Sequence, residues 1–407
     1  MQFFRNVDIV KRYKVDESTV RKWIRGAREG KLDLALHVEG SRTYIANTTR
    51  NTTLIADLIQ ERRKFRNSKA AKVVRPRPEF YKIYTQSQIY ELLTNLELHH
   101  EIPRQYNYFD GGAMSWDEYA QRLANEDAPN VMNRTINLLE ISQSFLDYLV
   151  SGYRRVNIVD LGVGNALPVK AFLSRLLERG ILGRYIALDI SAEMLEIARR
   201  NIKSWFDNQV VFEGYEMDIS RERFTNILAE EYLKPDADET INLVLLLGGT
   251  PYNFRNPDGV LQCIHDSMGA KDYLVHTMKL DTEVTRQYFD FNANRAKSPL
   301  PPIHRFVIDI LNIDPSLYEL ELGFDEVRKQ RYERIRFTTA LTIEFEFDEG
   351  RRAVSFSKGE SVLVWRSWQQ TVKDLTRQFD RNDFYILTAV QTVDMEYVLT
   401  VSRAKED

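Results

Sequence analysis

Three acidic side chains lie in or after apolar segments and could together bind one polar ligand. Asp160 lies in the segment VNIVDLGVG, Asp189 closes the segment YIALD, and Asp218 follows the segment VVFEGYEM. Apolar segments of this kind, bounded by glycine, predict buried strands of a parallel sheet. After Asp160, Gly162 and Gly164 let the backbone approach a bound molecule closely. The three acids therefore predict one ligand cleft at the carboxyl ends of three strands.

The spacing of these residues favours a ligand that has no phosphate. A dinucleotide-binding GxGxxG motif counted from Gly162 requires a third glycine where this chain has Leu167. Asp189, at the end of the second strand, can accept hydrogen bonds from both ribose hydroxyls. Asp218 can accept the adenine amine, and a sulfonium and an ammonium tolerate Asp160 nearby. The alternative is a tight glycine turn beside three solvated acids.

This pattern resembles the class I methyltransferases, which implies S-adenosyl-L-methionine as the cofactor. The segment Glu193 to Trp205 predicts a helix after the second strand, and Ile241 to Leu247 predicts a fourth buried strand. We expect an α/β fold with a Rossmann-like, doubly wound sheet of the class I methyltransferase type. The expected cofactor-binding residues are Asp160, Gly162, Gly164, Asp189, Ile190, Asp218, Ile219, Gly248 and Tyr108.

The composition is that of an enzyme built from more than one structural unit. At 407 residues the chain exceeds one core of ordinary size, so two or three units are expected. The single Cys263 excludes an intramolecular disulfide, and the densely charged start contains no signal peptide or long apolar span. These features favour a cytoplasmic protein without a membrane partner. The histidines show no paired metal spacing, and we expect no metal site.

Charge is distributed unevenly along the chain. Residues 1–77 hold 19 Lys or Arg against 8 Asp or Glu, a net charge of +11, so the remainder carries −14 to reach the total of −3. Asn6 to Tyr13 predicts one helix and Glu17 to Arg28 a second one after a short turn. Leu34 to Val38 and Arg42 to Ile45 predict a two-stranded wing.

Residues 1–50 resemble the winged helix-turn-helix of excisionase and MerR-type DNA-binding domains. The resemblance implies double-stranded DNA as a partner, with the second helix in the major groove and the wing near phosphate. Such modules often act in pairs, which makes a homodimer possible. The alternative is a small helical module that dimerises or packs on the enzyme, its charges merely solvated. The expected DNA-binding residues are Ser18, Thr19, Arg21, Lys22, Arg25 and Arg42.

Residues 51–78 are expected to connect this module to the enzyme. Leu54 to Phe65 predicts a basic helix. Arg66 to Pro78 predicts an extended linker, because Pro76 and Pro78 block a helix.

The segment from 79 to 150 lacks the sheet pattern and is rich in aromatic residues. Its part YNYFDGGAMSWDEYA, from Tyr106, resembles the aromatic lid that precedes the first strand in many class I methyltransferases. Aromatic faces stabilise a sulfonium by cation–π attraction. Tyr108 is therefore the expected lid contact.

The segment GGTPYNF follows the fourth strand, at the place that faces the methyl acceptor in methyltransferases. Amino-group DNA methyltransferases have an acid or Asn followed by two prolines and an aromatic residue here. This chain has Gly249, Thr250, Pro251 and Tyr252, so the amine acceptor and one proline are missing. Base methylation of DNA or RNA is disfavoured but stays open because of the basic N-terminal module.

Taken together, residues 79–403 resemble the histidine-specific Nα-methyltransferases of ergothioneine biosynthesis. The resemblance rests on DLGVGNALPVKAFL, LLGGTPYNF, Phe80 to Tyr90 and the β-rich segment Tyr332 to Val364. It implies that Asn253 holds an amino-acid substrate and that Gly248 lines the cofactor side. The expected substrate-binding residues are Asn253, Tyr288, Phe289 and Tyr252.

One departure from this family concerns the substrate. The family's late Glu-x-Ser pair, which recognises the imidazole, should fall in Leu363 to Trp368, where this chain has LVWRSW. Leu363 and Trp365 stand in place of the acid and the serine. A buried polar pair discriminates strongly, so its loss makes histidine an improbable substrate. Trp365 and Trp368 suggest either an apolar, aromatic or cationic acceptor or a core strand.

We therefore expect an S-adenosylmethionine-dependent methyltransferase that N-methylates a small amino compound other than histidine and is fused to a DNA-binding module. No catalytic base is evident. A transcription regulator that senses a ligand or S-adenosylmethionine without turnover is the alternative, and a DNA or RNA methyltransferase is a second one. The expected parts are a DNA-binding module (1–50), a helix and linker (51–78), a helical lid segment (79–150), a methyltransferase core (151–280) and a substrate-side helical and β-rich part that completes the sheet (281–407).

Overall fold

Contacts divide the chain into two compact units in the computed structural model. The structure describes residues 3–13, 15, 17–40, 42–69, 71–109, 111–288 and 300–405. The N-terminal unit comprises Met1–Val73 with Thr339–Thr342 and Ser355–Lys358, and the larger unit comprises Val74–Thr338, Ile343–Val354 and Gly359–Asp407.

The N-terminal unit combines helices with a small antiparallel sheet of order β1-β3-β2. Its helix α2 carries an apolar stripe of Val20, Trp23 and Ile24, which is the i, i+3, i+4 spacing that packs inward. Both helices predicted before Gly30 are present with the predicted bounds. The elements are β1 (Phe3–Phe4), α1 (Asn6–Tyr13), α2 (Glu17–Arg28), β2 (Leu36–Glu39), β3 (Arg42–Ala46) and α3 (Thr49–Lys69).

The connector differs from its prediction. Helix α3 was expected to end at Phe65 but continues to Lys69. Residues 66–69 contain no glycine or proline, so nothing in the sequence ends the helix there. The strand β4 (Lys72–Val74) then belongs to a three-stranded sheet of order β13-β12-β4, so this part of the predicted linker is not free chain.

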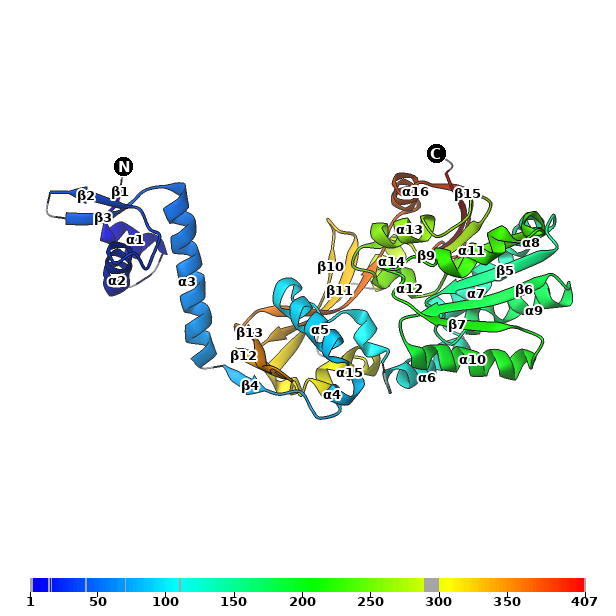
Figure 1. Ribbon diagram of the computed structural model, residues 1–407, viewed down its shortest axis with the longest axis horizontal. Coiled ribbons are helices and arrows are strands. Elements are labelled where there is room, and N and C mark those ends of the chain that lie inside the picture. Colours follow the sequence, from blue (N-terminus) through cyan, green and yellow to red (C-terminus); the bar gives the residue numbers. More distant parts are fainter. Residues whose placement is uncertain are drawn as a thin grey trace. The chain divides into compact units, whose positions relative to one another are not determined.

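The larger unit is built on a seven-stranded sheet of order β15-β16-β9-β8-β5-β6-β7 (Figure 1). Strands β7, β6, β5, β8 and β9 are parallel to one another, whereas β16 runs antiparallel to both β9 and β15. The last two strands of the chain therefore extend the sheet beyond β9. The strands are β5 (Arg155–Leu161), β6 (Leu182–Asp189), β7 (Phe212–Glu216), β8 (Thr240–Leu246), β9 (Tyr273–Lys279), β15 (Phe384–Gln391) and β16 (Tyr397–Ala404).

The register of this sheet brings the three acids to one edge. Asp160 of β5 pairs with Ala187 of β6, two residues before Asp189. Asp189 pairs with Glu216 at the end of β7, so Asp218 follows at the same edge.

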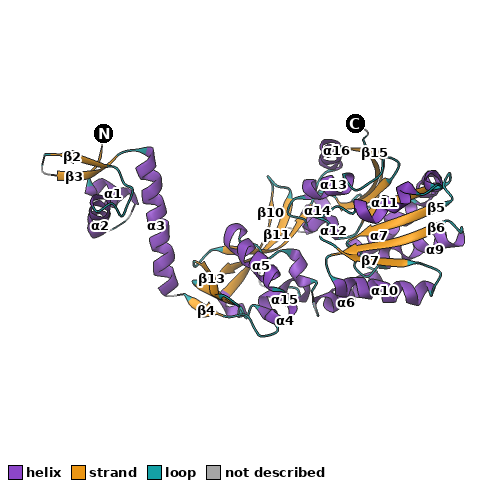
Figure 2. Cartoon of the chain, viewed as in Figure 1, coloured by secondary structure: helices purple, strands orange, loops and turns teal. Residues whose placement is uncertain are grey.

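Helices cover both faces of the sheet (Figure 2). Alternate residues of β5 point to opposite faces, since Ile158 belongs to one apolar cluster and Val159 to the other. Helices α7, α8, α9 and α10 pack on the first face and α11, α13 and α16 on the second. Their bounds are α7 (Val131–Ile141), α8 (Gln143–Val150), α9 (Lys170–Glu178), α10 (Ala192–Phe206), α11 (Thr225–Leu233), α13 (Pro257–His265) and α16 (Val372–Arg381).

Most of the remaining elements lie before β5 or between β9 and β15 in the chain, and η2, η3 and α12 lie in the connections between strands of the large sheet. Strands β10, β11 and β14 form a further three-stranded antiparallel sheet. Across the described segments, no helix combines the length and the apolar character needed to cross a membrane. The bounds are α4 (Phe80–Ile83), α5 (Gln86–His99), η1 (Arg104–Asn107), α6 (Gly112–Asn125), η2 (Leu167–Val169), η3 (Ala237–Glu239), α12 (Thr250–Asn253), α14 (Glu283–Tyr288), α15 (Pro302–Ile310), η4 (Pro315–Leu317), β10 (Tyr318–Asp325), β11 (Gln330–Phe337), β12 (Leu341–Phe347), β13 (Gly350–Phe356) and β14 (Ser361–Trp368).

Candidate active site

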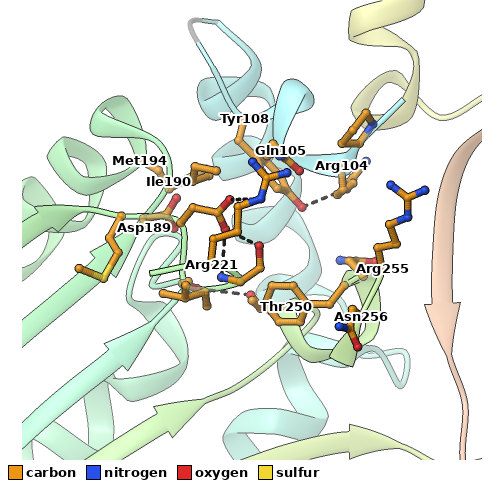
Figure 3. Close-up of a pocket in the computed structure, with 18 of the residues that line it drawn as sticks. Arg104, Gln105, Tyr108, Asp189, Ile190, Met194, Arg221, Thr250, Arg255 and Asn256 are labelled. Atoms are coloured by element: carbon orange, nitrogen blue, oxygen red, sulfur yellow. Dashed lines mark hydrogen bonds and ion pairs between the residues drawn. The ribbon is translucent and has the colours of Figure 1, made fainter. Parts of the chain in front are cut away.

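A cavity of about 290 Å³ opens at the carboxyl edge of the sheet, inside the larger unit (Figure 3). Its walls come from the loops after β5, β6, β7 and β8 and from α5, η1 and α6, which precede the sheet in the chain. Of the residues expected to bind cofactor or substrate, the cavity is lined by Tyr108, Gly162, Gly164, Asp189, Ile190, Asp218, Ile219 and Asn253.

The turn after β5 requires glycine at two positions. Gly162 has a φ of +66° and Gly164 a φ of +55°, conformations that other residues adopt only with strain. A Cβ atom on Gly162 would lie 2.7 Å from Cγ2 of Thr250, and one on Gly164 would lie 3.1 Å from the Trp116 ring. The bare backbone therefore leaves room for the cavity walls to meet here.

Asp189 is a nearly buried carboxylate, 8% exposed, on the cavity wall. Its Oδ2 accepts a hydrogen bond from the Gly164 N–H at 3.3 Å, and its Oδ1 accepts one from the Ser191 N–H at 3.1 Å. Burial raises the pKa of Asp189 to about 6, although these backbone donors act against the shift. A ligand that donates hydrogen bonds to this carboxylate would stabilise its charged form.

Asp160 lies behind the cavity wall rather than on it. Its side chain is 4% exposed, and its Oδ2 accepts a hydrogen bond from the Tyr185 hydroxyl at 2.8 Å. Burial raises the pKa of Asp160 to about 7, and the nearby Asp189 adds to the shift. Asp160, which was expected near the sulfonium and the ammonium, therefore does not line the cavity itself.

Gly248 is another expected cofactor residue that does not line the cavity. Its N–H donates to the Thr277 hydroxyl at 2.9 Å, so β9 holds the turn after β8. Thr250, two residues later, forms the wall instead and donates a hydrogen bond of 3.4 Å to the Gly162 carbonyl.

Tyr108 is held in the wall by contacts on both sides. The Ser191 hydroxyl donates to the Tyr108 carbonyl at 2.8 Å, and Nε of Arg104 donates to the Tyr108 hydroxyl at 3.0 Å. The Trp116 ring packs edge-on against Tyr108, with 6.4 Å between ring centroids. The aromatic segment thus supplies one wall of the cavity, next to the loop after β6.

An arginine and two acidic side chains lie together near the end of β7. Nη2 of Arg221 lies 2.5 Å from Oε1 of Glu91, and its Nε lies 3.7 Å from Oδ2 of Asp218. Oδ1 of Asp218 accepts hydrogen bonds from the Ser220 hydroxyl and N–H. The Asp218 side chain is therefore fixed by its own loop and faces a guanidinium.

Among the expected substrate residues, Asn253 lines the cavity and Tyr252 does not. Nδ2 of Asn253 donates to the Gly249 carbonyl at 2.9 Å, while its buried Oδ1 has no partner within the described residues. Tyr252 is 5% exposed and packs in the apolar cluster on the second face of the sheet. Tyr288 ends α14 but its side chain is not described, and Phe289 lies outside the described residues.

Several wall residues carry no recognisable motif and were missed from sequence. Glu91, Asn95 and Glu101 come from α5 and the segment after it, and Arg255 and Asn256 follow α12. No local pattern marks such isolated polar residues, although charged groups in an aromatic-rich segment are a weak signal. The missed residues that matter most for chemistry are Glu91, Asn95, Glu101, Arg104, Trp116, Arg221, Thr250 and Arg255.

Trp365 and Trp368 do not form part of this cavity. Trp365 stacks on His304, with 5.4 Å between ring centroids, and Nε1 of Trp368 donates to the Phe254 carbonyl at 2.6 Å. Leu363 bridges to the segment before η1 through its backbone, donating to His100 and accepting from Ile102. The core-strand interpretation of this segment is therefore the one that fits the structure.

In the N-terminal unit, α2 and β3 present most of the residues expected to touch DNA. Ser18, Arg21, Lys22 and Arg25 are exposed on α2, and Arg42 is exposed on β3. Thr19 is an exception, since it is 4% exposed. It precedes Trp23 by one helical turn and so lies on the buried stripe, which corrects its assignment to the exposed face.

Most of the chain matches one known protein family. Residues 86–404 match the family described as histidine-specific, S-adenosylmethionine-dependent methyltransferases. The chain belongs to this family. It is thus a methyltransferase that uses S-adenosylmethionine, and its central sheet with antiparallel β16 is a class I methyltransferase fold.

Solved structures similar to the methyltransferase share little sequence with it. A methyltransferase from Clostridium acetobutylicum is 11% identical, with a TM-score of 0.40, 72% of this chain and 99% of that chain covered. The 1,6-didemethyltoxoflavin N1-methyltransferase from Burkholderia thailandensis is 12% identical, with a TM-score of 0.35, 80% of this chain and 92% of that chain covered. No curated protein matches the chain.

Proposed function

We propose that this methyltransferase transfers a methyl group to the nitrogen of a small amino compound other than histidine. The observation that carries the proposal is the single cavity that joins the strand edge of Asp189 and Asp218 to a separate polar wall at Asn253. A cofactor bound along the first would place its reactive end near the second.

The residues at the strand edge fit S-adenosylmethionine. Asp189 would accept the ribose hydroxyls, which suits a buried carboxylate that has room for further donors. Asp218 would accept the adenine amine, with Ile190 and Ile219 against the base. The glycines at 162 and 164 let Thr250 and Trp116 pack close to this turn, because a Cβ at either position would press against them.

The role of the chain in the reaction is to hold and orient. The cofactor supplies an electrophilic methyl group on a sulfonium. The acceptor amine must be unprotonated and in line with that methyl group, and most of the rate gain comes from positioning and from the exclusion of water. Asn253 would position the amine, and the Tyr108 ring would lie near the sulfonium.

Two observations argue against histidine as the acceptor. The positions that correspond to the family's imidazole-binding pair hold Leu363 and Trp365, and neither lines the cavity. The imidazole that Trp365 contacts is that of the protein's own His304, which also binds Oε2 of Glu333 at 2.5 Å.

Calorimetry with S-adenosylmethionine and S-adenosylhomocysteine tests the cofactor site. We expect both to bind the wild-type chain and the Asp189→Ala variant to bind them at least tenfold more weakly; no binding at millimolar concentration would refute the proposal. A turnover screen of amines and amino acids, followed by formation of S-adenosylhomocysteine, tests the reaction. Efficient methylation of histidine would contradict its exclusion.

We also propose that the N-terminal unit binds double-stranded DNA. The support is a cluster of exposed cations, Arg21, Lys22 and Arg25, on the helix that follows a short turn, with Arg42 exposed on the hairpin. These groups could neutralise phosphates and reach base edges. Binding of a duplex library, followed by fluorescence anisotropy at several salt concentrations, tests this proposal.

A further inference from the structure

Three arginines line the cavity, namely Arg104, Arg221 and Arg255. Arg104 lies at the start of η1, and among the residues that the structure describes it forms no ion pair. Its Nε donates to the Tyr108 hydroxyl at 3.0 Å and its Nη1 to the Ile303 carbonyl at 2.9 Å, both uncharged acceptors. The nearby carboxylate of Glu333 is already bound to His304. The guanidinium of Arg104 therefore keeps its charge available on the cavity wall.

A second arginine, Arg255, is compensated only in part. Its Nη1 donates to Oδ1 of Asn95 at 3.1 Å, and its Nε lies 3.8 Å from Oε2 of Glu101, too far for a hydrogen bond. Glu101 instead contacts Arg366, and both of those side chains are only 10% exposed. Because the buried Arg366 takes the charge of Glu101, Arg255 retains donors for a ligand.

The third arginine of the cavity provides a contrast. Arg221 pairs with Glu91 and lies near Asp218, so two carboxylates balance its charge. In Figure 3, Arg104 and Arg255 lie on the side of the cavity away from Asp189 and Ile190. The positive charge that is not fully compensated thus lies at the end of the cavity opposite Asp189, the carboxylate proposed to bind the ribose.

Building on the proposed N-methyl transfer, we propose that the methyl acceptor carries an acidic group in addition to its amine, and that Arg104 and Arg255 bind this group. A guanidinium matches a carboxylate with two parallel hydrogen bonds and fixes its orientation. An acid held at this end would anchor the acceptor while its amine extends toward the methyl group. A neutral or purely cationic amine would add no anion to Arg104 and would leave Arg255 with only its distant contact to Glu101.

The carboxylate of S-adenosylmethionine itself offers the same chemistry. The two sources are distinguished by the ligand whose binding depends on the arginines. If they bind the acceptor, Arg104→Gln and Arg255→Gln leave the affinity for S-adenosylhomocysteine unchanged. If either variant weakens that affinity tenfold or more, the arginine binds the cofactor and the proposal is wrong.

The test uses amines that differ only by a carboxylate, with the full-length chain saturated with S-adenosylhomocysteine. The pairs are phenylalanine with phenethylamine, tyrosine with tyramine, and 4-aminobutyrate with propylamine. Calorimetry measures binding, and the same pairs with S-adenosylmethionine measure turnover. In at least one pair we expect the acid to bind about tenfold or more tightly than the amine, because a charged hydrogen-bond pair is lost otherwise.

Variants of the two arginines then test whether these residues cause the preference for the acid over the amine. Arg104→Gln and Arg255→Gln should each reduce it, whereas Arg154→Gln, an exposed arginine paired with Glu239, should not. Equal binding of both members in every pair, no binding of any acid at 10 mM, or a preference that survives in the double variant would each overturn the inference. Failure of S-adenosylhomocysteine to bind at all would instead refute the proposed cofactor site, so the two outcomes are separable.

Discussion

The hydroxyl of Tyr185 donates a hydrogen bond to the carboxylate of Asp160 on the neighbouring strand, with 2.8 Å between the oxygens. Both side chains lie inside the sheet, where they are 0% and 4% exposed. The hydrogen bond joins β5 to β6 just behind the cavity wall, so the role of Asp160 is to support the wall rather than to line it. Burial raises the pKa of Asp160, and the charge of Asp189, the carboxylate on the cavity side, adds to this shift.

The first prediction concerns this pair. The pKa of Asp160 is raised from 3.8 to about 7, so the folded chain binds more protons than the unfolded chain between these values, and stability falls as the pH rises through this window. Tyr185→Phe removes a donor and should raise the pKa of Asp160 further. We expect a loss of about 1–3 kcal/mol above pH 7 and a smaller loss at pH 5.

Thermal unfolding at pH 5, 7 and 8 measures this effect. The exposed Tyr148 is the matched control, and Tyr148→Phe should leave the unfolding temperature unchanged. A Tyr185→Phe effect of the same size at all three pH values would contradict the prediction.

The second prediction concerns the pH dependence of cofactor binding. Burial raises the pKa of Asp189 to about 6, and ribose hydroxyls would stabilise its charged form. S-adenosylhomocysteine should therefore bind more weakly as the pH falls below 6, by up to about tenfold per pH unit. Calorimetry between pH 5 and 8 checks this, and Asp189→Asn should flatten the profile. A flat profile in the wild type would remove Asp189 from the ribose site.

The third prediction concerns the glycine turn. In Gly162→Ala the new methyl group meets Thr250 and must displace it from the cavity wall. We expect S-adenosylhomocysteine affinity to fall about tenfold or more. Gly180→Ala is the control, since Gly180 also has a positive φ, +67°, but nothing within 4 Å of an added Cβ. That variant should lose only about 1–2 kcal/mol of stability and bind normally; equal affinity in both variants would speak against the turn.

The fourth prediction concerns DNA. Replacing Arg21 and Lys22 with Ala should weaken duplex binding and lower the slope of log affinity against log salt, by about 1 for each lost phosphate contact. Arg5→Ala with Lys31→Ala removes the same charge from positions outside α2 and serves as the control; like Arg21, which pairs with Glu17, both cations are paired with acids. An unchanged slope in the α2 variant, measured by fluorescence anisotropy, would exclude this surface.

Local sequence patterns were sufficient for the sheet and the cofactor edge. The apolar segments that end near Asp160, Asp189 and Asp218 form neighbouring strands, and the two glycines with positive φ occupy the turn expected for them. Such features depend on short stretches of chain, because strand burial and turn conformation are dictated by adjacent residues. The end of α3 was wrong because prolines beyond the helix were taken to act before Lys69.

The amino-acid sequence by itself determined the α/β class, the strands that end near the three acids and the identity of the cofactor, since each of these leaves a local pattern of hydrophobicity, glycine and acid. Only the tertiary structure decided which polar groups face the acceptor. Glu91, Arg104 and Arg255 come from separate segments of the chain. Whether each charge is paired or remains available to a ligand depends on which side chains pack next to it. The structure also shows that Asp160 lies behind the cavity wall and that Thr19 is buried in the N-terminal unit, because burial depends on packing between elements rather than on the residue alone.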